Sequence, residues 1–262
     1  MTIGLITARG GSTRIPRKNV QNYCGLPLVA WSVIQSVNTK KIDMTFLTTD
    51  DDEIAEIGAK YGATIIRRPV WDNGITAGVP MLHALKEIEK QSYIIDNIVT
   101  MLPTAALKKV DDLDRLIEVF NKLPTYVDNI TTMCPQKETF IFRNTTPYYD
   151  RFKTNPIHEY YEMSPEIGDK FWNYSRMGGG WGIATRDFLY NAWSTNPTTD
   201  LEIDTKPVDK NVKITAIPIE EWQLVDIDYP EDLELSQVLF EHYVLKGHGP
   251  EIYEEYKKDI IE

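Results

Sequence analysis

Residues 2–19 read TIGLITARGGSTRIPRKN, and this stretch decides the fold class. Its first part, residues 2–8, is a short apolar run, which predicts a buried strand. The strand leads directly into Gly10, Gly11 and a polar loop that ends at Asn19. A buried strand that enters a glycine-rich loop predicts the first unit of an α/β sheet.

The first half of the chain alternates short apolar runs with apolar residues at helical spacing. Further strands are predicted over residues 44–48, 64–66, 97–101 and 130–133, and helices over residues 30–37, 54–61, 81–88 and 113–120. Gly62 is placed to end the second of these helices. Strands that alternate with helices form βαβ units, so we predict an α/β fold with a mainly parallel sheet and helices on both faces. Such sheets bind ligands beyond the carboxyl ends of their strands.

The second half is less regular. Residues 140–175 are rich in Tyr, Phe, Asn and Pro without a clear period, which indicates an inserted subdomain or an oligomer arm. Strands over residues 181–184 and 212–217 rejoin the sheet, and Leu235, Val238 and Leu239 begin a late helix. We therefore predict one domain over residues 1–249, with the insertion at about residues 140–175, and a charged helical tail over residues 250–262.

The composition limits the function. The chain has 262 residues, 42% hydrophobic and 26% charged, which is typical of a globular protein. Its 28 Lys and Arg against 39 Asp and Glu give a net charge of -11, which argues against binding duplex nucleic acid or an anionic membrane. Cys24 and Cys134 are interpreted as buried thiols, and we find no secretory signal or transmembrane run. We expect a cytoplasmic protein with no nucleic-acid or membrane partner.

Four cations, Arg9, Arg14, Arg17 and Lys18, stand within ten positions of the glycine-rich loop. Amides at a glycine turn and clustered guanidinium groups suit a polyphosphate, because both donate hydrogen bonds to its oxygens. The alternative is a solvated basic loop. The chain has neither G-x-x-x-x-G-K-[ST] nor G-x-G-x-x-G after the first strand, which disfavours a P-loop kinase or ATPase and a dinucleotide oxidoreductase.

Residues 8–19 closely resemble the signature of the acylneuraminate cytidylyltransferases, the CMP-sugar-acid synthetases. Shorter segments match in the family's order and at about its spacing: residues 49–55 (TDDDEIA), 68–69 (RP), 102–104 (LPT) and 225–232 (VDIDYPED). The resemblance implies a Rossmann-like nucleotidyltransferase fold and a homodimer. It also implies that CMP is transferred from CTP to the anomeric hydroxyl of a 2-keto sugar acid, either a nonulosonic acid or a Kdo-like acid, and that pyrophosphate is released.

The resemblance also implies the residues of the site. The nucleotide would contact Ala8, Arg9, Gly10, Gly11, Ser12, Arg14, Lys18, Asn19 and Arg68. Asn19 would lie at the cytidine end, Asp226 and Asp228 would hold Mg²⁺, and the catalytic set would be these two aspartates with Arg9 and Lys18. Attack on the α-phosphorus gathers negative charge on oxygen, which fixed cations and Mg²⁺ offset. Two aspartates spaced two residues apart project to one side of an extended segment, as a pair of Mg²⁺ ligands requires.

Both acidic motifs also have a structural interpretation. Asp228 with Glu231 fits a capping box, so Asp228 could be only the N-cap of a helix. Residues 50–52 fit a capping cluster for the helix that follows them, and we leave them out of the catalytic set. A purely structural role is less apparent for Asp226, so Asp226 is the stronger candidate for binding the metal.

Two positions depart from the family pattern. Thr13 stands where the family has Lys, so Arg14 or Arg17 is expected to replace that triphosphate contact. Leu102 stands where the family has a Gln near the acceptor, and leucine cannot form a hydrogen bond. The acceptor is therefore expected to be an unusual one, whereas nucleotide binding is less affected.

We predict that the acceptor binds to Leu102, Thr104 and Arg176, and that it is a small acid. Arg176 fits an acceptor carboxylate or a surface ion pair equally well. Two other functions stay open: a nucleotidyltransferase for a phosphonate or an alcohol phosphate, and a nucleotide-binding protein without catalysis.

Overall fold

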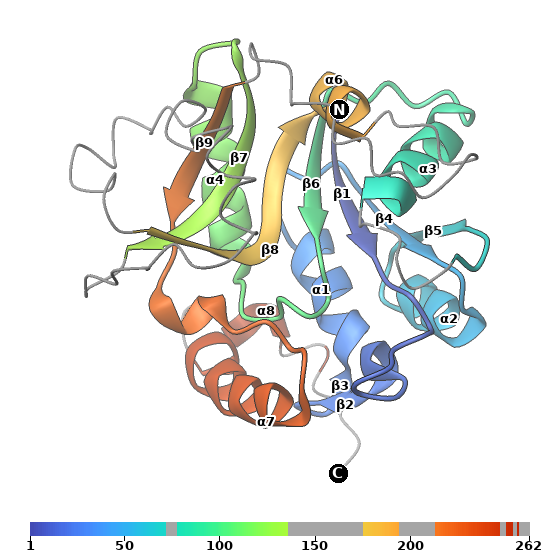
Figure 1. The fold of residues 1–262 in the computed structure, drawn as a ribbon, viewed down its shortest axis with the longest axis vertical. Coiled ribbons are helices and arrows are strands. Elements are labelled where there is room, and N and C mark those ends of the chain that lie inside the picture. Colours follow the sequence, from blue (N-terminus) through green and yellow to red (C-terminus); the bar gives the residue numbers. More distant parts are fainter. Residues whose placement is uncertain (72–77, 136–174, 194–212, 247–249, 254–255, 257–262) are drawn as a thin grey trace, which may run out of the picture.

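The computed structural model describes residues 1–71, 78–135, 175–193, 213–246, 250–253 and 256. Seven strands form one sheet in the order β5-β4-β1-β6-β8-β7-β9 (Figure 1). In that order they span Thr64–Arg67, Met44–Thr49, Thr2–Thr7, Asn97–Met101, Ser175–Thr185, Val127–Pro135 and Lys213–Pro218. β8 is antiparallel to both its neighbours and the other pairs are parallel, so the predicted mainly parallel sheet is confirmed.

Helices cover both faces of this sheet (Figure 1). One face carries α1 (Leu28–Val37), α2 (Asp52–Lys60) and α4 (Val110–Lys122), and the other carries α3 (Gly78–Glu89) and α6 (Arg186–Trp193). Successive strand residues point to opposite faces, so β1 sends Ile6 into the first core and Leu5 into the second. Both side chains are fully buried, which explains why β1 is an unbroken apolar run.

The parallel strands bring three loops to one edge of the sheet. β1 lies between β4 and β6, with Leu5 opposite Phe46 on one side and Thr100 on the other. Because the three strands run in the same direction, the chain leaves each of them at the same edge. The glycine-rich loop after β1 therefore lies beside the segments that follow β4 and β6.

α2 begins and ends as the sequence predicts. The carboxylate of Asp51 accepts a hydrogen bond of 3.0 Å from the backbone N–H of Ile54, which makes Asp51 the N-cap. Gly62 adopts a φ of 99° just beyond the helix, in the left-handed region that glycine enters without strain. One member of the acidic cluster at residues 50–52 is thus a cap, as expected.

The late helix differs from the prediction. α7 (Pro230–Leu239) starts well before Leu235, and the side chains of Leu235 and Val238 are 51% and 66% exposed. The buried position is Ser236, whose carbonyl accepts a hydrogen bond of 2.9 Å from the Tyr23 hydroxyl. The helix is therefore held partly through its backbone and partly by Leu233 and Leu239, which are partly buried against the core.

The chain near its C-terminus packs against α1. After α7, the π-helical turn Phe240–Leu245 places the Phe240 ring 5.0 Å from Trp31, and α8 (Pro250–Tyr253) places Tyr253 at 5.7 Å from the same ring. Of the predicted helical tail over residues 250–262, only α8 and Tyr256 are among the described residues. The predicted insertion lies outside them as well, except for its last residue. Among the described helices, none has the length and apolar character that crossing a membrane requires.

Candidate active site

A cleft of about 510 Å³ opens at the carboxyl edge of the parallel strands. Its walls are Thr7, Ala8, Arg9, Ser12, Thr13, Arg14, Ile15, Lys18, Asn19, Arg68, Pro80, Leu102, Pro103, Thr104 and Asp228. Most of the predicted site residues are therefore brought together. Gly10, Gly11 and Asp226 are not in the walls. Arg176 lies on β8, but the structure does not describe its side chain.

The glycine-rich loop has a defined path. Its first amide, Ala8 N–H, donates to the Thr48 carbonyl at 3.1 Å, and Ser12 N–H donates back to the Gly10 carbonyl at 3.1 Å. A Cβ on Gly10 would lie 2.5 Å from a carboxylate oxygen of Asp51, whereas a Cβ on Gly11 would meet nothing within 4 Å. Gly10 is therefore required by the close approach of the loop to α2, and Gly11 is not required by space.

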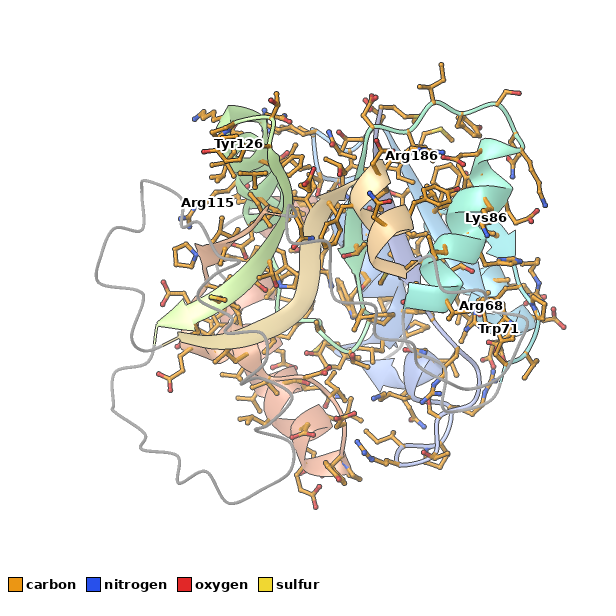
Figure 2. The ribbon with its side chains drawn as sticks, turned by 45° about the horizontal axis from the view of Figure 1, so that its top comes forward. Arg68, Trp71, Lys86, Arg115, Tyr126 and Arg186 are labelled. Carbon is orange, nitrogen blue, oxygen red and sulfur yellow. The ribbon has the colours of Figure 1, made fainter. Side chains whose placement is uncertain are left out.

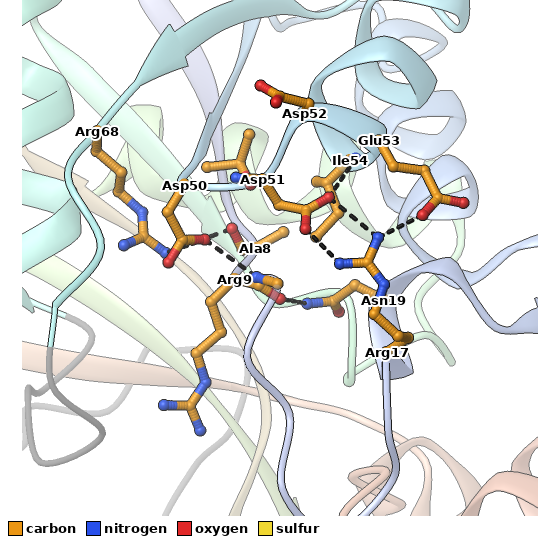
Figure 3. A network of polar contacts seen from close by, with 12 residues as sticks. Ala8, Arg9, Arg17, Asn19, Asp50, Asp51, Asp52, Glu53, Ile54 and Arg68 are labelled. Atoms are coloured by element: carbon orange, nitrogen blue, oxygen red, sulfur yellow. Dashed lines mark hydrogen bonds and ion pairs between the residues drawn. The ribbon is translucent and has the colours of Figure 1, made fainter.

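The cations of the loop have different neighbours. Arg9, Arg14 and Lys18 line the cleft, but Arg17 does not. Arg17 donates to Asp51 and to Glu53 in the first turn of α2, and this bond to Arg17 holds the pKa of Asp51 below its usual range (Figure 3). Of the two arginines expected to replace the missing lysine contact, the structure therefore leaves Arg14 in place and assigns Arg17 to the fold.

Lys18 and Arg14 connect the loop to the segment before α7. The Lys18 ammonium donates to the carbonyl of Ile227 and lies 3.7 Å from the Asp228 carboxylate. Arg14 lies 3.1 Å from the other oxygen of Asp228, with its guanidinium 4.9 Å from the ring centre of Tyr229. Burial lowers the pKa of Lys18, while Asp228 and Asp226 oppose this shift. Two cations and one carboxylate thus face each other across the mouth of the cleft.

The structure rejects the capping interpretation of Asp228. The N-cap of α7 is Tyr229, and the carboxylate that accepts from the backbone is that of Asp232, at 3.0 Å from Asp228 N and 2.8 Å from Tyr229 N. The Asp228 side chain is thereby available to the cleft. Asp226 and Asp228 flank Ile227, which is fully buried and donates its N–H to the Thr104 carbonyl at 3.1 Å.

These two carboxylates suit a Mg²⁺ ion that is shared with a phosphate. No group of three or more metal-binding side chains occurs among the described residues, so a site built from protein ligands alone is not found there. Mg²⁺ commonly takes only one or two carboxylates and completes its shell with phosphate oxygens and water. The donor set of Asp226 and Asp228 therefore fits the predicted ion.

Asn19 is buried in the wall of the cleft, with 6% of its surface exposed. Its amide nitrogen donates to the Arg9 carbonyl at 2.9 Å, and its amide oxygen has no partner among the described residues. A buried acceptor without a donor is costly. The oxygen thus marks a place where a ligand N–H group would be stabilised.

Sequence reasoning missed Asp50. This residue follows β4 directly, accepts from Gly10 N–H at 3.0 Å and lies 3.5 Å from the Arg68 guanidinium (Figure 3). Arg68 also lies over Trp71, 5.1 Å from its ring centre, at the edge of the sheet beside α3 (Figure 2). The signal that could have found Asp50 is its place: it is the first acidic residue after a parallel strand next to β1.

The wall that is predicted to face the acceptor is mainly apolar. Leu102 and Pro103 line the cleft together with Thr104. The Leu102 N–H donates to the Gly180 carbonyl at 3.0 Å and its carbonyl accepts from Ala105 N–H at 3.2 Å. The backbone of Leu102 is thus committed to the fold, and its side chain is what this position offers to a ligand.

Comparison with known proteins matches residues 3–240 to the family described as cytidylyltransferase. A pseudaminic acid cytidylyltransferase of Campylobacter jejuni is 34% identical over 119 residues, which cover 44% of this chain and 51% of that protein. The chain thus spans about half the length of this curated relative.

Solved structures share the fold. A cytidylyltransferase from Leptospira borgpetersenii covers 99% of this chain and 96% of its own, with a TM-score of 0.61 and 17% identity. A CMP:2-keto-3-deoxy-manno-octonic acid synthetase in complex with CTP covers 92% of this chain and 98% of its own, with a TM-score of 0.59 and 16% identity. The family match covers residues 3–240, which is most of the sequence. This chain belongs to the cytidylyltransferase family.

Proposed function

We propose that the protein transfers CMP from CTP to a hydroxyl of a 2-keto sugar acid and releases pyrophosphate. The family match supports the nucleotide chemistry. The Campylobacter relative, named for pseudaminic acid, supports a nonulosonic acid as the acceptor, and a Kdo-like acid belongs to the same chemical class.

The observation that carries this proposal is the set of three cations that one glycine-rich loop places in the cleft. Arg9, Arg14 and Lys18 all line it, in a protein whose net charge is -11. Cations concentrated on one glycine-rich loop suit a triphosphate, because they offset charge on several phosphate oxygens at once. We assign the triphosphate to this loop, with Ala8, Gly10, Gly11 and Ser12 shaping its path.

Asn19 and Arg68 would orient the nucleoside. The unpartnered amide oxygen of Asn19 can accept from an N–H group, such as the exocyclic amine of cytosine. Arg68 lies in the same wall, and its Nε is buried without a partner among the described residues. These two unmet hydrogen-bonding groups favour a polar ligand that is inserted between them.

Asp226 and Asp228 would hold Mg²⁺. When bound there, the ion would offset negative charge on phosphate oxygens. Without a ligand, Asp228 is paired with Arg14 and Lys18. When CTP is bound, these two cations would turn toward the phosphates.

In the proposed reaction, the oxygen of the acceptor hydroxyl forms a bond to the α-phosphorus of CTP. The bond from that phosphorus to the oxygen bridging to the β-phosphate breaks, and its electron pair leaves with pyrophosphate. The hydroxyl proton passes to water. Arg9 and Lys18 would stabilise the charge that gathers on the phosphate oxygens, so the contribution of the protein is mainly position and electrostatics.

The acceptor would bind on the side of Leu102 and Thr104, with Arg176 as a partner for its carboxylate. A phosphonate or an alcohol phosphate remains the alternative acceptor, because Leu102 offers no hydrogen bond where the sugar-acid enzymes have a Gln.

We also propose that the protein is a homodimer and that it is cytoplasmic. Light scattering of the purified protein tests whether it is a dimer.

A screen of acceptors tests the proposal. The protein is incubated with CTP, Mg²⁺ and one acceptor at a time: several 2-keto sugar acids, a phosphonate and an alcohol phosphate, with release of pyrophosphate as the readout. We expect turnover with a sugar acid, and its loss in Asp226→Ala but not in Asp52→Ala, a matched change at an aspartate that is 91% exposed. Turnover with the phosphonate alone would overturn the acceptor class. CTP binding without turnover of any acceptor would favour a binding protein.

A further inference from the structure

Three consecutive aspartates after β4 have three different environments. Asp51 is the N-cap of α2. Asp52 pairs with Arg67 on the surface, where the two side chains are 91% and 48% exposed. Asp50 pairs with Arg68, and these side chains are only 8% and 6% exposed. The capping interpretation of the cluster therefore leaves Asp50 unexplained.

Asp50 contacts two parts of the candidate site at once. One of its oxygens, Oδ1, accepts from Gly10 N–H at 3.0 Å and lies 3.5 Å from the terminal nitrogen of Arg68 (Figure 3). Gly10 belongs to the loop after β1, and Arg68 follows β5 on the far side of β4. A single carboxylate thus links the glycine-rich loop to the arginine that follows β5.

Asp50 is the charged partner of Arg68, at 3.5 Å. The other contacts of Arg68 are with neutral groups and are about as long: 3.4 Å to the carbonyl of Ala8, 3.4 Å to that of Pro69, and the face of Trp71. Burial lowers the pKa of Arg68 and Asp50 opposes this shift, so Asp50 is the group that makes a buried guanidinium tolerable. Removing the carboxylate would leave Arg68 free to turn away from its place in the wall.

We propose that Asp50 is a positioning residue, which holds the glycine-rich loop at Gly10 and the Arg68 guanidinium in one frame, so that Arg68 and the loop cations meet the nucleotide correctly. The inference rests on the proposed function, because it concerns how CTP is held. Asp50 does not line the cleft and need not touch CTP. Its effect on CTP should therefore act through Arg68 and the loop.

Calorimetric titration of CTP into the protein in the presence of Mg²⁺, without acceptor, tests this role. Asp50→Asn keeps an oxygen for Gly10 but removes the charge that orients Arg68. We expect the Kd for CTP to rise about tenfold in Asp50→Asn, which corresponds to a coupling commonly measured between contacting residues. Asp52→Asn is the matched control, and we expect its Kd to change less than about twofold.

A double-mutant cycle separates positioning from general destabilisation. If Asp50 acts through Arg68, then Asp50→Asn should weaken CTP binding by less than about twofold in a protein that already carries Arg68→Gln. Effects that multiply in the double variant, or an unchanged Kd in Asp50→Asn, would overturn the inference.

Should Asp50→Asn fail to fold, Asp50→Glu is a second variant, which keeps the charge and displaces it by one methylene. An unchanged Kd in Asp50→Glu would overturn the inference, and a raised Kd with an unchanged melting temperature would support it. A wild-type protein that binds no CTP would instead contradict the proposed function.

Discussion

β1 and β6 are neighbouring parallel strands, yet the loops that follow them are built in different ways. The β1 loop (residues 8–19) exposes Arg9, Gly11, Thr13 and Arg14, and few side chains hold it: Asp50 accepts from Gly10 N–H, and Asn19 donates to the Arg9 carbonyl. The β6 loop (residues 102–109) buries all its residues from 105 to 108, and buried side chains hold its backbone: Gln35 donates to the carbonyls of Ala106 and Lys108, and Gln223 donates to that of Leu107. One wall of the cleft offers charge on an exposed chain, and the other offers a packed surface.

This difference indicates that the two loops divide binding and stability between them within the cleft. Exposed cations can move to meet phosphates without disturbing the core, so changes there should affect binding more than folding. The β6 loop is continuous with the core, so changes there should affect stability first, and ligand preference only at Leu102 and Thr104.

Lys108 offers the strongest test, because it is a fully buried amine in the packed loop. Its Nζ donates to Ser32 Oγ at 3.0 Å and to the Ala105 carbonyl at 2.9 Å, and burial lowers its pKa from 10.5 to about 7. Between these two values the unfolded chain holds the proton and the folded protein does not, so stability rises with pH across this window. Lys108→Met should remove this dependence, which amounts to on the order of 4 kcal/mol over the full window.

Urea unfolding of the wild type and of Lys108→Met, from about pH 6 to pH 10, measures this effect. The difference between the two proteins cancels groups that titrate in both. Lys109→Met is the matched control, since that neighbouring lysine is only partly buried, and it should keep the wild-type slope. Equal slopes in the wild type and Lys108→Met would show that the β6 loop does not depend on a neutral amine.

Gly10 and Gly11 test the exposed loop. A Cβ at Gly10 would collide with Asp51, so Gly10→Ala must shift either the loop or the start of α2. A displacement of about 1 Å in a site can lower turnover on the order of 100-fold, and we expect a loss of this size in kcat/KM. Gly11→Ala has open space around its new methyl group and should fold like the wild type. Circular dichroism and steady-state kinetics on both variants check this, and equal losses in the two would contradict the assigned geometry.

The contrast between the loops also explains what could be predicted from the sequence. The strands and helices that pack the sheet follow from apolar spacing, and the glycine-rich loop follows from its composition. The helix α7 was less predictable, because Leu235 and Val238 face solvent and its buried residue is the polar Ser236, whose carbonyl accepts from Tyr23. Backbone contacts of this kind leave no trace in a hydrophobic pattern.

Within the site, residue type was predictable and pairing was not. Arg14 and Arg17 are both arginines and stand three positions apart. Arg14 lines the cleft, whereas Arg17 binds the start of α2. Asp50 and Asp52 differ in the same way, since one is buried beside Arg68 and the other is exposed beside Arg67. Which of two like residues turns inward depends on long-range packing, which a single sequence does not reveal.

Mutation of Arg9 and of Arg17 tests this difference between residues of the same type. Arg9→Ala removes a cation from the cleft wall and should raise the Kd for CTP about 30-fold, as expected for lost charge-assisted hydrogen bonds. Its melting temperature should stay close to that of the wild type, because an exposed loop cation contributes little to folding. Arg17→Ala should do the reverse: lower the melting temperature through α2 and leave CTP binding nearly unchanged. A collapse of stability in Arg9→Ala with normal CTP affinity would contradict the assignment of the β1 loop.

Leu102 is where the packed loop meets the ligand, and its effect should be the smallest and the most selective. Its backbone N–H and carbonyl are both used by the fold, so only the side chain can discriminate between acceptors. Leu102→Gln places a donor and an acceptor in an apolar wall. It should therefore change by about tenfold the ratio of kcat/KM between two sugar acids that differ by one hydroxyl, in favour of the hydroxylated one. Leu102→Met, which keeps the wall apolar, should leave that ratio unchanged, and the KM for CTP should be constant in both variants. If Gln and Met shift the ratio equally, or if only the KM for CTP changes, then Leu102 belongs to the nucleotide side and the division between the two loops fails at this position.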